Sequence, residues 1–94
     1  MTNDQSFMSQ SAAITVTVKL FAAYQEAYGR SEIVLQFPPQ TPAIAVLKRL
    51  ISQHPELEKW QEITRFGINC QFVSPDTLLV NGDEVVLIPP VSGG

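Results

Sequence analysis

The sequence predicts a two-layer α+β domain, in which one main helix packs on a mixed β-sheet. Residues 14–21 alternate between apolar and other side chains, which is typical of a half-buried strand. Residues 41–53 carry apolar side chains at helical spacing. Residues 84–88 are apolar on both faces, as expected of a strand that is central in its sheet or whose outer face is covered by something else. With helices on one side of such a sheet, the chain forms two layers.

Length and charge narrow the class of protein. The 94 residues make one domain, and a net charge of −3 argues against a nucleic-acid binder, which would carry a basic stripe. No apolar run is long enough to span a membrane, no signal peptide is evident, and a single cysteine excludes an internal disulfide. We therefore expect a soluble cytoplasmic protein. Its predicted parts are a disordered extension (1–12), the domain (13–88) and a flexible C-terminal tail (89–94).

The first half of the domain is predicted as strand, short helix, strand and long helix. Residues 22–28 favour a helical turn that stops at Gly29, a natural C-cap. Residues 32–37 alternate again and form the second strand, which returns antiparallel to the first. Thr41 is predicted to cap the main helix with Pro42 at its first position, and His54-Pro55 ends it. The helix presents one apolar stripe to the sheet: Ile44, Leu47, Leu50 and Ile51.

The second half is predicted as a loop followed by three strands. Residues 56–62 are charged around Trp60 and form a short turn or loop. Residues 66–73 form the third strand, with Cys70 as a small core residue beside Ile68. A brief strand over 78–80 and the turn Asn81-Gly82-Asp83 precede the last strand. Only one helix is available to cover a face of that strand, so its outer face is expected to meet a partner.

The last six residues are Pro89-Pro90-Val91-Ser92-Gly93-Gly94. Two prolines end the strand and push the tail out, and the terminal glycines leave the carboxylate without a neighbouring side chain. Six extended residues span at most roughly 20 Å. Such a tail can place its carboxylate in the active site of another protein.

From these features the sequence resembles the ubiquitin-like sulfur-carrier family, and within it the small subunits of molybdopterin synthase. The resemblance covers residues 14–94 and is sharpest in the ending just described and in Asn81-Gly82-Asp83-Glu84-Val85. Leu20-Phe21-Ala22, Glu26, Gly29 and Ile68-Asn69 agree with it. The N-terminal dozen residues are extra relative to the family pattern. The fold that the resemblance implies is the β-grasp.

The resemblance implies a carrier rather than an enzyme acting on its own. A separate, E1-like activating enzyme would use ATP to adenylate the carboxylate of Gly94, and sulfur would then give a thiocarboxylate. That group would deliver sulfur to the pterin precursor of molybdopterin inside the large subunit, in an assembly of two small and two large subunits. The chain itself would bind no cofactor and no metal, and it contains no glycine-rich phosphate loop.

The resemblance also implies a docking surface. Phe21, Phe72 and Ile88 are apolar residues without a place in the predicted core, and their positions match the family's apolar patch. The tail would continue the contact as it enters the channel of the large subunit, through Pro89, Pro90, Val91, Ser92 and Gly93.

Three alternatives stay open at this point. A sulfur carrier for thiamine thiazole synthesis has the same fold and terminal chemistry, although such carriers lack this Pro-Pro-Val-Ser approach to the glycines. A ubiquitin-like protein tag would be conjugated to lysines through Gly94. A binding module would use neither glycine.

Overall fold

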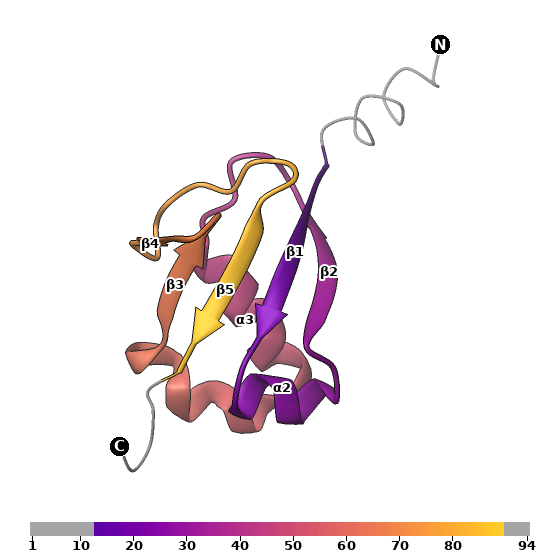
Figure 1. Cartoon of the computed structure of the whole chain (residues 1–94), viewed down its shortest axis with the longest axis vertical. Coiled ribbons are helices and arrows are strands. Elements are labelled where there is room, and N and C mark those ends of the chain that lie inside the picture. Colours follow the sequence, from indigo (N-terminus) through magenta and orange to yellow (C-terminus); the bar gives the residue numbers. More distant parts are fainter. Residues whose placement is uncertain (1–12, 90–94) are drawn as a thin grey trace.

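The computed structural model describes residues 13–89, so the predictions for residues 1–12 and 90–94 lie outside the described part. Its five strands form one mixed sheet with the helices on one face (Figure 1). In chain order the strands are β1 (Ile14–Leu20), β2 (Glu32–Phe37), β3 (Arg65–Ile68), β4 (Gln71–Val73) and β5 (Glu84–Ile88). The helices are α2 (Ala23–Tyr28), α3 (Ile44–Gln53) and the 3₁₀ helix η1 (Pro55–Ile63).

The last strand of the described chain is central in the sheet, as its apolar faces predict. The spatial order is β2-β1-β5-β3-β4, with β5 parallel to β1 and antiparallel to β3. β1 pairs antiparallel with β2, with Val18 opposite Ile33. The predicted return from the first strand to the second is therefore confirmed.

The core lies between the sheet and α3. Alternate residues of β1 and β5 point into it, and they meet Val46, Leu47 and Leu50 of α3, which are fully buried. Ile44 and Ile51, also predicted on this stripe, are half-buried at its margins. The helical spacing therefore identifies the correct face of α3, although its centre is shifted toward Val46.

The start of α3 differs from the prediction. Thr41 does not cap the helix, because its hydroxyl donates to the carbonyl of Pro38 at 2.6 Å. Its own carbonyl accepts from the amide of Leu79, and the amide of Ala43 donates to the carbonyl of Thr77, both at 2.8 Å. The backbone of residues 41–43 is thus held by the neighbouring loop, and the helix begins only at Ile44.

The third predicted strand is two strands joined by a tight hairpin. β3 ends at Ile68 and β4 begins at Gln71, so Asn69 and Cys70 form a two-residue loop. Both have positive φ, 50° and 73°, as a type I′ turn requires. Cys70 is exposed in this turn, and its predicted place in the core is wrong.

Two further segments differ in detail. The predicted loop over 56–62 lies within the nine-residue helix η1, which begins directly after His54. The predicted brief strand over 78–80 reduces to one isolated bridge between Leu78 and Pro42, with Leu79 buried beneath it. Among the residues described, no helix has the length and apolar character needed to cross a membrane.

Candidate functional site on the open face of the sheet

The sheet face turned away from α3 is not covered by any other described element (Figure 1). We call it the open face. Because side chains alternate along each strand, it carries the residues of β1 and β5 that do not enter the core. Across the sheet, these residues form a row by direct strand pairing: Glu32, Lys19, Val86, Gly67 and Phe72.

A shallow apolar hollow lies at one end of this row. Its volume is about 180 Å³, and its lining residues are Gly67, Cys70, Gln71, Phe72, Val86 and Ile88. Gly67 stands directly between Val86 and Phe72 in the row, and its missing side chain leaves the space between them open. The Phe72 side chain is 69% exposed, which is high for a large apolar residue. The hollow therefore offers an apolar surface of the kind that marks interaction sites.

The three predicted docking residues are distributed around this hollow. Phe72 and Ile88 line it, whereas Phe21 lies outside its lining. Leu20 pairs with Leu87, so Phe21, directly after β1, and Ile88 on β5 are the next residues along two neighbouring segments. Phe21 is 48% exposed. Two of the three are thus brought together in one depression, and the third follows at the same end of β1.

A strained turn sets the position of Phe21. The carbonyl of Phe21 accepts the amide of Tyr24 at 3.0 Å, which closes a four-residue turn. Ala22 in this turn has φ 51° and ψ −123°, the geometry of the first central residue of a type II′ turn. Glycine is usual at that position, because a Cβ there is crowded. The turn ends β1 abruptly and leaves Phe21 at the surface.

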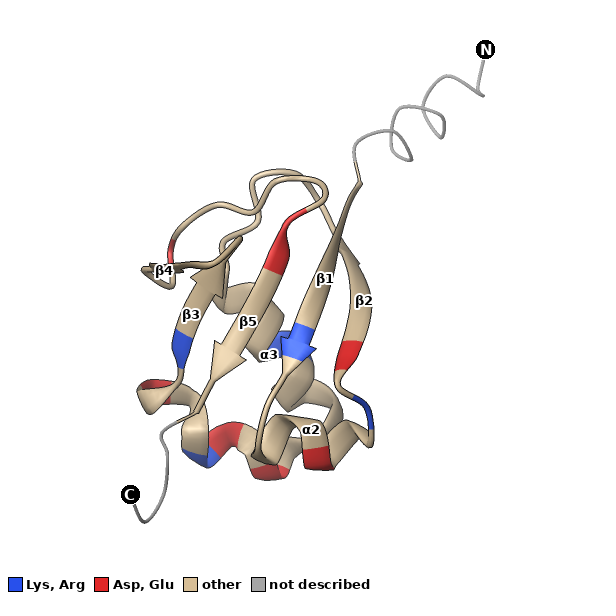
Figure 2. Cartoon of the chain, in the orientation of Figure 1, with Lys and Arg blue, Asp and Glu red and all other residues tan. Residues whose placement is uncertain are grey.

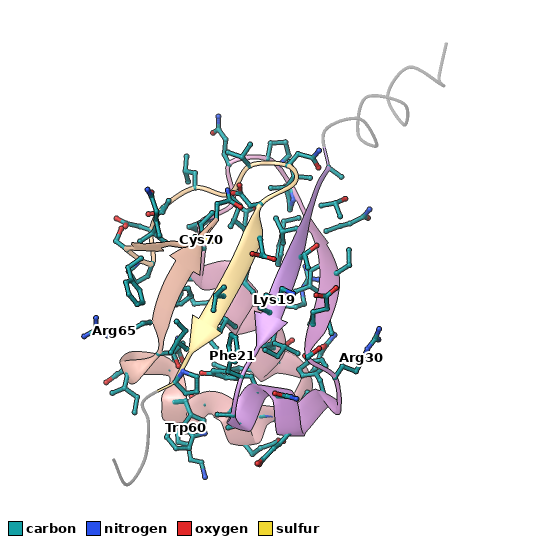
Figure 3. All side chains as sticks on the ribbon, in the orientation of Figure 1. Lys19, Phe21, Arg30, Trp60, Arg65 and Cys70 are labelled. Carbon is teal, nitrogen blue, oxygen red and sulfur yellow. The ribbon has the colours of Figure 1, made fainter. Side chains whose placement is uncertain are left out.

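Charged groups border the apolar part of the open face. The ammonium of Lys19 lies 2.7 Å from a carboxylate oxygen of Glu32 and 3.9 Å from one of Glu84. The hydrogen bond that the Lys19 ammonium donates to Glu32, followed by the negative charge of Glu32, raises the pKa of Lys19 above its ordinary value. On the other side, the guanidinium carbon of Arg65 lies 6.0 Å from the centre of the Phe72 ring. Figure 3 labels Lys19 on β1 and Arg65 near the start of β3.

The hairpin that carries Phe72 is tied to β5 by Asn69. The amide of Asn69 donates to the carbonyl of Glu84 at 2.9 Å, and its side-chain oxygen accepts the amide of Glu84 at 3.0 Å. Its side-chain nitrogen donates to Oδ1 of Asp83 at 2.9 Å. The other carboxylate oxygen of Asp83 accepts the amide of Val80 at 2.8 Å. Asp83, 8% exposed, thereby links the 81–83 turn to the β3–β4 hairpin.

The chain leaves the sheet beside this surface. Ile88 pairs with Arg65 at the end of β5, and Pro89, the last described residue, is buried. Pro90, Val91, Ser92, Gly93 and Gly94 lie outside the described residues, so their predicted roles remain predictions. Five extended residues beyond Pro89 reach at most about 17 Å.

Sequence reasoning missed Gly67, and it placed Asn69 in a strand rather than in the turn that ties the hairpin to β5. The contribution of Gly67 to the hollow can be recognised only once its neighbours across the sheet are known, because a glycine within an apolar run has no distinctive sequence signal. Asn69 offered a better signal, since asparagine tolerates positive φ and favours the first central position of a type I′ turn. The uninterrupted apolar alternation around it favoured one long strand instead.

The sheet order, the single main helix and the final central strand define a ubiquitin-like β-grasp domain. The predicted fold is therefore confirmed. Residues 18–94 match the ThiS family, and the chain belongs to that family. The human molybdopterin synthase sulfur carrier subunit is 33% identical over 82 residues, covering 84% of this chain and 93% of the human protein. Its name agrees with the role that the sequence predicts.

Solved structures show the same fold. Small archaeal modifier protein 1 from Methanosarcina acetivorans is 30% identical, with a TM-score of 0.68, covering 87% of this chain and 98% of that one. A complex of subunits 1 and 2 of the molybdopterin-converting factor from Helicobacter pylori contains a chain that is 21% identical, with a TM-score of 0.56. This match covers 86% of the present chain and 100% of that chain.

Proposed function

We propose that this chain is the sulfur carrier subunit of molybdopterin synthase, with Gly94 as the residue that carries sulfur. The observation that supports it most directly is the family match, which extends through the Gly-Gly ending. The geometry adds a reason: β5 is rigidly held in the centre of the sheet and leads straight into the tail. A rigid domain thereby presents a short reactive end within a limited radius.

The chemistry requires an activating partner. A free carboxylate is a poor electrophile and has to be activated first. On an E1-like enzyme the Gly94 carboxylate would attack ATP, forming an acyl adenylate and releasing pyrophosphate. A sulfur nucleophile would then displace AMP and leave a thiocarboxylate. ATP belongs to the partner in this scheme, and this chain binds no cofactor. The thiocarboxylate sulfur would then be transferred to the pterin precursor within the large subunit.

Intact mass measurement tests this function directly. The chain is incubated with ATP, a sulfur donor and the activating enzyme of its host. The expected product gains the mass difference between one sulfur and one oxygen, and fragmentation localises the gain to Gly94. A chain lacking Gly93 and Gly94 should show no gain. An unchanged mass of the full chain would contradict the proposal.

The large subunit is the proposed docking partner, and the hollow with Phe21, Phe72 and Ile88 is the proposed contact. Two small subunits would bind a dimer of large ones. Phe72→Ala removes an exposed ring, so the free energy of unfolding should change by less than about 0.5 kcal/mol. Binding to the large subunit should weaken about tenfold or more, as for an aromatic anchor at an interface. Calorimetric titration measures the affinity, and Val34→Ala on the distant edge strand β2 is the matched control.

Ile88→Asp provides a stricter test of the same contact. A charge in an apolar contact is strongly unfavourable, so this variant should not co-elute with the large subunit. Unchanged co-elution of both Phe72→Ala and Ile88→Asp would place the contact elsewhere.

A second candidate function is a protein modifier, because a small archaeal modifier protein is 30% identical over nearly its whole length. Both functions begin with adenylation of Gly94 and diverge afterwards. A modifier would become attached to lysines of other proteins through an isopeptide bond. Complementation distinguishes the two: a strain lacking its molybdopterin carrier regains the cofactor only if this chain donates sulfur. A strain lacking its thiamine thiazole carrier tests the remaining alternative in the same way.

A further inference from the structure

A second depression, a groove, lies between α2 and η1. Its volume is about 290 Å³, and its lining residues are Ala23, Glu26, Ala27, Glu56, Leu57, Lys59 and Trp60. The apolar lining comes from the two alanines, buried Leu57 and half-buried Trp60, which all belong to the core or pack against it. Glu26 and Glu56 are exposed along it.

The groove lies close to the point where the chain leaves the sheet. The carbonyl of Trp60 accepts the hydroxyl of Thr64 at 2.7 Å. The next residue, Arg65, pairs directly with Ile88, which precedes Pro89. Trp60 and Arg65 are labelled in Figure 3 at this end of the molecule. A partner that receives the tail therefore passes the groove.

The groove is acidic. Figure 2 marks acidic residues in red on α2 and on η1, the helix after α3. Glu26 and Glu56 line the groove together with a single cation, Lys59, whose ammonium lies 5.5 Å from the centre of the Trp60 ring. Glu56 also lies 3.6 Å from Nδ1 of His54. Glu58 and Glu62 of η1 are exposed but do not line the groove.

We propose that this groove binds an arginine or lysine side chain of the large subunit, at the rim of the channel that receives the tail. The inference rests on the carrier function proposed above. A channel that accepts an anionic carboxylate or thiocarboxylate must supply positive charge, and an acidic surface beside the tail complements it. The aliphatic stem of the basic side chain lies on Trp60 and Leu57, and its cationic head contacts Glu26 and Glu56.

Paired charge substitutions test the groove against general electrostatic attraction. The variant Glu26→Gln with Glu56→Gln removes the two groove carboxylates. The control Glu58→Gln with Glu62→Gln removes the same charge from the same end of the molecule. Affinity for the large subunit is measured by calorimetric titration at low and at high salt. We expect the groove pair to weaken binding about tenfold at low salt, with a shallower salt dependence, and the control pair to bind within about twofold of wild type.

Trp60 supplies an independent readout, because it is the only tryptophan in the chain. Labelled with 5-fluorotryptophan, the chain gives one ¹⁹F resonance that reports on the groove. Addition of the large subunit should shift this resonance, and the groove pair should reduce the shift measured at saturating partner. Equal weakening by both pairs, or an unmoved resonance at saturation, would overturn the proposal.

The experiments distinguish a wrong groove proposal from a wrong carrier function. If the groove pair binds as wild type while Ile88→Asp does not bind, the groove proposal is wrong and the docking contact stands. If Gly94 forms no thiocarboxylate, the carrier function is wrong, and the groove proposal falls with it.

Discussion

At the scale of single residues, the strained backbone of Ala22 keeps a neighbouring side chain at the surface and adds nothing to the core. A non-glycine residue at φ 51° and ψ −123° is strained by about 1–3 kcal/mol. The strained turn ends β1 at Leu20 and leaves Phe21 exposed beside Ile88. Helix α2 begins at the next residue, Ala23, so no irregular segment separates the turn from the helix and could relieve the strain.

Ala22→Gly should therefore stabilise the protein. Glycine removes the steric strain, and the greater freedom of the unfolded chain offsets only about 0.4–1 kcal/mol of that gain. We expect the free energy of unfolding in urea to rise by about 1 kcal/mol with an unchanged m-value. Ala45→Gly, in the regular helix α3, is the control and should lower it by about 1 kcal/mol. A similar loss at both positions would show that Ala22 is unstrained.

At the scale of elements, α2 is fixed to the end of η1 by a buried chain of hydroxyl groups. The Tyr24 hydroxyl is hydrogen-bonded to that of Thr64, which donates in turn to the carbonyl of Trp60. Burial raises the pKa of Tyr24 above its ordinary value of 10.0. Because the unfolded chain then loses this proton more readily than the folded one, the contribution of Tyr24 is complete below pH 10 and is lost as the pH rises further.

Tyr24→Phe tests this link. At neutral pH the loss of one hydrogen bond should lower the free energy of unfolding by about 1 kcal/mol. Above pH 10, stability should fall less steeply with pH than in wild type, because one shifted group has been removed. The pKa of Tyr28 is also raised, mainly by burial, so part of the alkaline dependence should remain. Urea titrations across the alkaline range measure both effects; an unchanged slope would exclude Tyr24 as a contributor.

Periodic elements could be predicted from the sequence, and locally irregular ones could not. The alternation in β1 and the two apolar faces of β5 reflect burial directly, so the existence of both strands followed from them, and a central position was one of the two readings that they allowed for β5. The β3–β4 hairpin was missed because its turn is Asn69-Cys70, without the glycine that usually marks one. Helix η1 was missed because a 3₁₀ helix lacks the 3.6-residue spacing by which helices are recognised.

The candidate site shows the same division. Phe72 and Ile88 were predicted from the resemblance and from having no place in the core, and pairing across the sheet brings them to one hollow. The groove between α2 and η1 depends on tertiary packing of two short helices. No periodic pattern in residues 23–27 or 56–60 indicates that they face each other.

At the scale of the whole molecule, β5 completes the sheet, because it pairs with a strand on each side. Removing Gly93 and Gly94 should therefore leave the melting temperature within about 1 °C of wild type while abolishing thiocarboxylate formation. Removing the chain from Val86 onward takes away most of the central strand and should leave the domain unfolded. Circular dichroism on heating measures both. A cooperative transition in the longer truncation would show that β5 is dispensable.

The central position of β5 has a consequence for biosynthesis. β5 follows β1 and β3 in the chain but lies between them in the sheet, so the sheet is complete only after residue 88 has been synthesised. Chains released before residue 88 lack the strand that joins the two halves of the sheet and are exposed to cellular proteases. Every folded molecule has consequently been synthesised through β5, so folding itself selects chains that extend at least to residue 88.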